Sequence, residues 1–81
     1  MGYEYKIACA PPKDEDLAIL FSRLPSPIDR KSMREIYNYR IEEDGFYFVD
    51  YLVSCDVAAV ALRVFLDAAL STTEKVTISE P

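Results

Sequence analysis

The sequence predicts an α+β fold in which two helices cover one face of a four-stranded antiparallel sheet. A hairpin pattern occupies the middle of the chain, with Asp44-Gly45 between two runs rich in aromatic and β-branched residues. One helix-like segment lies on each side of this hairpin, and one strand-like segment lies near each end of the chain. The elements therefore follow the order β-α-β-β-α-β.

The first strand and the first helix are separated by a change of period. Between residues 3 and 9, apolar side chains occupy every second position, which is typical of a strand with one buried face. Two consecutive prolines end this strand. From Asp14 the apolar residues recur at helical spacing, and acidic residues fill the first turn, where the helix dipole favours them. Two further prolines end the helix, and we expect Ile28 and Met33 of the following connection to pack against the domain edge.

The hairpin predicts which side chains share a face of the sheet. A type I′ turn at Asp44-Gly45 pairs Ile41 with Phe48 and Arg40 with Val49. We assign the more apolar face to the helices. The open face then carries Glu4, Lys6, Ala8, Asn38, Arg40, Glu42, Tyr47, Val49, Tyr51 and Thr77.

The second helix is expected to begin at Asp56, a good N-cap residue, and the chain to close with a strand over residues 74–79. Alanine, leucine and phenylalanine form a stripe of this helix that faces the core. Val57, Val60 and Val64 lie on a different flank and exceed what a two-helix layer needs to bury. A second copy of the chain would cover this surplus, so we expect a homodimer.

This element order in a chain of 81 residues is typical of a ferredoxin-like two-layer sandwich, a single domain over residues 1–81. Right-handed crossovers place the first and third strands at the centre of the sheet and the second and fourth at its edges. Cys9 and Cys55 are expected at the same end of the central strands. They are either a redox-sensitive pair or two small apolar residues in a reducing cytosol.

Composition argues against two classes of partner. The net charge is −5, and phosphate contacts need clustered Lys and Arg, so nucleic acid and anionic membranes fit poorly. The N-terminus lacks the pattern of a secretory signal, and the apolar stretch over residues 57–66 contains Arg63 and is too short to span a bilayer. We expect a cytoplasmic protein without membrane contact.

The sequence contains no motif that identifies a reaction or a ligand. It has no histidine, no glycine-rich phosphate loop and no Cys-x-x-Cys, so we expect no enzyme activity, no metal and no cofactor. Acylphosphatases share this fold class, but they need an arginine in the loop after the first strand, where this chain has Pro11-Pro12-Lys13.

Residues 44–51, Asp-Gly-Phe-Tyr-Phe-Val-Asp-Tyr, resemble the RNP1 segment of RNA-recognition motifs, which lies on the third strand of the same element order. The resemblance implies binding of single-stranded nucleic acid, with bases stacked on Phe46, Phe48 and Tyr5. Asp44 stands where the motif has a basic residue, and Tyr47 where it has a small one. We keep this function as the alternative.

The start of the first helix, from Pro12 to Leu24, resembles that of ACT regulatory domains. That resemblance implies an amino-acid pocket, but the glycine that lets the ligand approach the helix is absent here, with Glu15 or Asp16 near its place.

The leading hypothesis is a small acidic interaction or regulatory module without catalysis. Its partner is expected to be a protein, and a basic one if the module acts as an inhibitor or immunity protein. The predicted binding residues are Arg40, Tyr47, Val49 and Tyr51 on the open sheet face and Val57, Val60 and Val64 on the second helix.

Overall fold

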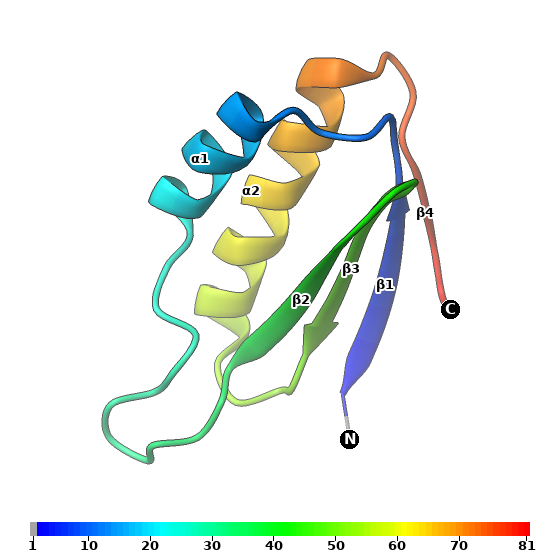
Figure 1. Cartoon of the computed structure of the whole chain (residues 1–81). Helices are drawn as coiled ribbons and strands as arrows, with labels where there is room; N and C mark the ends of the chain where they lie inside the picture. The colour runs from blue at the N-terminus through cyan, green and yellow to red at the C-terminus, as the bar shows by residue number, and fades with distance from the viewer. Residues whose placement is uncertain (1) are drawn as a thin grey trace.

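A computed structural model describes residues 2–81, which form four strands and two helices in the predicted order (Figure 1). The elements are β1 (Tyr3–Ala8), α1 (Asp14–Arg23), β2 (Tyr37–Glu42), β3 (Gly45–Asp50), α2 (Cys55–Thr72) and β4 (Thr77–Ser79). The sheet order is β2-β3-β1-β4, and each neighbouring pair is antiparallel. The predicted α+β fold with a four-stranded antiparallel sheet is confirmed, and β1 and β3 are its central strands, as expected.

Both helices lie on the same side of the sheet, and the core fills the space between the two layers (Figure 1). Ile7, Phe46, Phe48 and Phe65 are each at most 1% exposed. The ring of Phe65 on α2 lies 5.1 Å from that of Tyr39, 5.2 Å from Phe46 and 5.7 Å from Phe48, measured between centroids. Burial of one phenylalanine contributes about 1.5–3 kcal/mol, so these contacts determine which face of the sheet the helices cover.

The predicted hairpin register is wrong by two residues. Ile41 pairs with Phe46 rather than Phe48, and Arg40 pairs with Tyr47. The turn consists of residues 43 and 44, and Gly45 is already the first residue of β3. Because side chains alternate with a period of two, a shift of two residues leaves every side chain on its predicted face.

Gly45 is required by a close approach of two strands. Its φ is +141°, a region that residues with a side chain rarely adopt. A Cβ here would overlap the carbonyl oxygen of Ile7 and lie 3.1 Å from the amide nitrogen of Cys9. That amide donates a hydrogen bond of 3.1 Å to the carbonyl oxygen of Asp44, which joins the end of β1 to the hairpin.

The second helix and the last strand begin at different residues from those expected. Ser54 occupies the N-cap of α2, so Asp56 is not the cap but lies in the first turn, where the helix dipole still favours its charge. Strand β4 is limited to Thr77–Ser79, because it pairs only with Lys6, Ile7 and Ala8 of β1.

The two cysteines are not neighbours. Strands β1 and β3 are antiparallel, with Tyr3 opposite Asp50 and Ala8 opposite Gly45. Cys9 therefore lies at one end of the sheet and Cys55, which follows β3, at the other. The expectation that the two cysteines lie at the same end of the central strands is wrong, a redox-sensitive pair between them is excluded, and both thiols are free.

The connection between α1 and β2 extends away from the body of the domain (Figure 1). Its stem is closed by a hydrogen bond of 2.6 Å from the amide of Ile36 to the carbonyl of Pro27. At the turn, the carboxylate of Asp29 accepts hydrogen bonds from the Ser32 hydroxyl (2.8 Å) and the Lys31 amide (3.2 Å). This turn points Met33 into solvent, so the expectation that Met33 packs against the domain edge is wrong; its side chain is 74% exposed.

We expect Gly45→Ala to destabilise the domain by about 1–3 kcal/mol, because alanine combines a disfavoured φ with a clash against β1. Urea unfolding followed by circular dichroism measures this loss. Glu43→Ala in the same turn is the control, with a change within about 0.5 kcal/mol. Equal stability of the two variants would contradict the assignment.

Candidate binding face of the sheet

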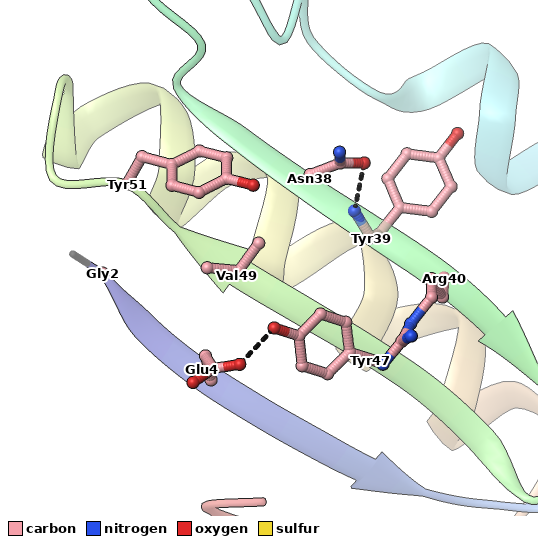
Figure 2. Close-up of a pocket in the computed structure, with 8 residues that line it drawn as sticks. All are labelled: Gly2, Glu4, Asn38, Tyr39, Arg40, Tyr47, Val49 and Tyr51. Atoms are coloured by element: carbon pink, nitrogen blue, oxygen red, sulfur yellow. Dashed lines mark hydrogen bonds between the residues drawn. The ribbon is translucent and has the colours of Figure 1, made fainter.

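The face of the sheet opposite the helices carries a mixed set of polar and aromatic side chains. Four predicted binding residues, Arg40, Tyr47, Val49 and Tyr51, line one shallow depression of about 450 Å³ (Figure 2). The remaining lining residues are Gly2, Glu4, Asn38 and Tyr39. The structure thus brings together the sheet half of the predicted site.

Tyr47 is the centre of this depression. Its hydroxyl donates a hydrogen bond to the carboxylate of Glu4 on β1 (Figure 2). On the other side, the guanidinium carbon of Arg40 lies 4.5 Å from the centroid of the Tyr47 ring, a cation–π contact. The hydrogen bond to Glu4, together with desolvation, raises the pKa of Tyr47. The ring is therefore held from both neighbouring strands.

The side chain of Lys6 extends across the same face of the sheet, nearer the hairpin turn. The ammonium of Lys6 on β1 lies 2.5 Å from Glu42 Oε1 and 2.7 Å from Asp44 Oδ1. Glu42 belongs to β2, so the Lys6 side chain passes over β3, where Gly45 has no side chain in the way. Hydrogen bonds to Asp44 and then Glu42 raise the pKa of Lys6, and the hydrogen bond from Lys6 lowers the pKa of Asp44.

These contacts leave Arg40 as the charged group on this face without an opposite charge. Glu4 accepts from Tyr47, and Glu42 and Asp44 accept from Lys6. Within residues 2–81, ion pairs are made by Lys6, Arg23 and Arg63, and none by Arg40. The guanidinium of Arg40 is therefore stacked but not neutralised.

Asn38 has a local role at the edge of the site. Its side-chain oxygen accepts a hydrogen bond of 2.8 Å from the backbone amide of Tyr39 (Figure 2). The amide of Tyr51 donates to the carbonyl of Ile36, so by alternation the Tyr39 amide points to the outer edge of β2. Asn38 thus accepts a hydrogen bond from the Tyr39 amide, which makes no hydrogen bond to a neighbouring strand within residues 2–81.

Sequence reasoning placed Glu4 and Asn38 on the open face but did not select them as site residues. The contact of Glu4 with Tyr47 depends on the pairing of β1 with β3, in which Glu4 lies opposite Val49 and Lys6 opposite Tyr47. Nothing in the local pattern of either strand specifies that pairing, because the two strands are separated by more than thirty residues.

The helix half of the predicted surface is smaller than expected. Val64 is 7% exposed and lines the groove between the helices together with Leu20 of α1. Val57 is half-buried, and Val60 is 54% exposed. The surplus of apolar surface on this flank of α2 is therefore reduced to Val60, because packing against α1 uses Val64.

The phenylalanines of the RNP1-like segment do not lie on the open face. Phe46 and Phe48 are buried against Phe65 of α2. Tyr5 lies on the same side, 6.3 Å from Phe48 between ring centroids. From this segment, Tyr47 and Tyr51 are the aromatic residues that line the depression.

Other chemical features are few in the part of the chain that the structure describes. Among residues 2–81, no group of three His, Cys, Asp or Glu side chains is placed to hold a metal ion. No helix in this range has the length and apolar character needed to cross a membrane. Desolvation raises the pKa of the Cys9 thiol, which disfavours the reactive thiolate.

No protein-family model matches this chain, and neither does any curated protein or solved structure.

We expect Lys6→Gln to lower stability at pH 7 and this loss to shrink in acid. Because folding lowers the pKa of Asp44, its ionised form favours the folded state above its unfolded pKa of about 3.9. This contribution is lost as the pH falls through the folded pKa, while Lys6 stays charged throughout. Urea unfolding between pH 7 and pH 3 measures the effect.

Lys75→Gln serves as the control for that series, since Lys75 makes no ion pair with residues 2–81. Its stability relative to the wild type should not change with pH in this range. A Lys6→Gln effect of constant size from pH 7 to pH 3 would argue that the side chain acts through packing alone.

Proposed function

We propose that this chain is a small non-catalytic protein-interaction module whose binding surface is the open face of the sheet. The observation that carries this proposal is the shared depression formed by Arg40, Tyr47, Val49 and Tyr51. Tyrosine and arginine are enriched at the energetic centres of protein interfaces. A depression that is shallow rather than enclosed suits a segment of another protein better than a small molecule, which pockets usually bury on most sides.

The strand order supports assigning the sheet to the ferredoxin-like arrangement. In that arrangement β1 and β3 occupy the centre, and both connecting helices return across one face. The second face is then free along its whole length, so a partner can contact three adjacent strands at once.

The polar groups on the open face support binding rather than a reaction. The Tyr47 hydroxyl is engaged by Glu4, and the Lys6 ammonium is engaged by two carboxylates. A lysine nucleophile needs a lowered pKa, whereas the pKa of Lys6 is raised. The chain has no histidine to act as a general base at neutral pH.

Binding of single-stranded nucleic acid has weaker support. The bases would need exposed aromatic rings, yet Phe46 and Phe48 are in the core.

We expect Tyr51→Ser to reduce retention of a partner protein by about tenfold or more, because tyrosines at interface centres contribute strongly to affinity. The measurement is affinity capture of the tagged chain from a lysate of its source organism, with nuclease treatment and mass spectrometry. Wild-type protein should retain a stoichiometric protein partner.

Tyr3→Ser is the matched control for that capture. Tyr3 is 60% exposed but occupies the helix side of β1, in alternation with the buried Ile7. Circular dichroism of both variants is measured to check that they fold. Undiminished capture by Tyr51→Ser, or retention of nucleic acid instead of protein, would refute the proposal.

A further inference from the structure

Four of the nine Lys and Arg residues of this acidic chain lie in β2 and in the connection that leads to it. Residues 29–40 contain Arg30, Lys31, Arg34 and Arg40 against Asp29 and Glu35, a net charge of +2 in a chain whose total is −5. None of the four basic side chains forms an ion pair with a carboxylate of residues 2–81. The Asp29 carboxylate is already occupied by Ser32 and the Lys31 amide.

A second hollow along β2 connects the stem of the α1–β2 connection to the depression. This hollow, of about 480 Å³, is lined by Pro27, Ile28, Glu35, Tyr37, Asn38 and Tyr39. Asn38 and Tyr39 also line the depression around Tyr47. At about 3.3 Å per residue, the chain from Arg34 to Arg40 spans roughly 20 Å. A single extended segment of six or seven residues can therefore contact both ends of this path.

The local contacts select the charge of that segment. One face of the Arg40 guanidinium is stacked on the Tyr47 ring, which leaves N–H groups at its rim free to donate. Two parallel N–H groups of a guanidinium can donate hydrogen bonds to the two oxygens of one carboxylate. The ring of Tyr51 lies in the same depression and suits an aromatic or aliphatic neighbour of that carboxylate, whereas Val49 is only 7% exposed and offers little contact surface.

We infer that the segment bound here is an acidic stretch of a partner protein, which places one carboxylate on Arg40 and further carboxylates along the Arg30–Arg34 loop. This inference rests on the proposed function and specifies the partner of the same face. It reverses the charge of the partner suggested by the net charge of the chain. Glu4, Glu42 and Asp44 have internal donors, so none of them needs a basic group from a partner.

The probes are three ten-residue peptides that share Tyr and Val at fixed positions and carry Glu, Gln or Lys at all the others. Each is titrated into the isotopically labelled full chain, and amide chemical shifts give both affinity and location. The Glu peptide should bind about tenfold more tightly than the Gln or Lys peptide at low salt. On addition of the Glu peptide, the largest changes in amide chemical shift of the labelled chain should occur at Tyr47, Tyr51 and residues 30–40. The affinity of this peptide should fall as salt is added.

Arg40→Gln should weaken binding of the Glu peptide by about tenfold, the size expected for loss of hydrogen bonds to a charged group. Arg63→Gln is the matched control: Arg63 is an exposed arginine on α2, and Asp67 keeps its second partner Arg23. This control removes the same charge from the helical layer and should change the affinity by less than about twofold.

Equal or tighter binding of the Lys peptide would overturn the acidic inference, as would equal losses from Arg40→Gln and Arg63→Gln. Absence of binding by the Glu peptide at millimolar concentration would also overturn it.

A ten-nucleotide oligothymidylate that binds more tightly than the Glu peptide would favour nucleic acid instead. A captured partner that is lost with Tyr51→Ser, combined with preference for the Lys peptide, would leave the proposed function standing and remove this inference alone.

Discussion

The packing of Phe65 against Tyr39, Phe46 and Phe48 is the contact on which the arrangement of this molecule depends. It attaches α2 to the middle of the sheet and so commits one face to the core. Because side chains alternate along each strand, the same contact determines which polar residues are left on the other face. The candidate binding surface is thus a direct consequence of where four aromatic rings meet.

The charge of the surface illustrates the difference between an average and a local property. The net charge of −5 describes the field at a distance. Within contact range, the open face is governed by which charges are already compensated, and Lys6 compensates two carboxylates at once. The compensation leaves Arg40 as the group with the most to gain from a partner.

Much of the fold could be predicted from the sequence, because helical and strand periods are local properties. The order of the elements and the separation of the two sheet faces followed from those periods. The hairpin register could not be predicted, because Gly45 serves a close approach to Ile7, a residue far away in the chain. Cys9 and Cys55 each follow one of two adjacent antiparallel strands and so lie at opposite ends of the sheet; the predicted antiparallel order already implied this, and the expectation of a shared end was inconsistent with it.

The candidate site was predicted only in part for the same reason. Alternation placed Arg40, Tyr47, Val49 and Tyr51 on one face, and the structure joins them in one depression. The Arg40–Tyr47 stacking and the Tyr47–Glu4 hydrogen bond need the pairing of three strands, which is a tertiary property. Val64 was predicted to be on the surface, but in the structure it packs beside α1. The position of α1 cannot be inferred from the pattern of α2 alone, so this burial could not be predicted.

The hydrogen bond from the Tyr39 amide to Asn38 affects how this domain behaves in a crowded solution. An edge strand with free amides is a template on which strands of other molecules can add, and continued addition leads to fibrils. In β2 the side chain of Asn38 occupies the central outward amide, so an incoming strand would have to displace it first. The domain can therefore present a broad sheet face to a partner while its β2 edge resists uncontrolled growth of the sheet.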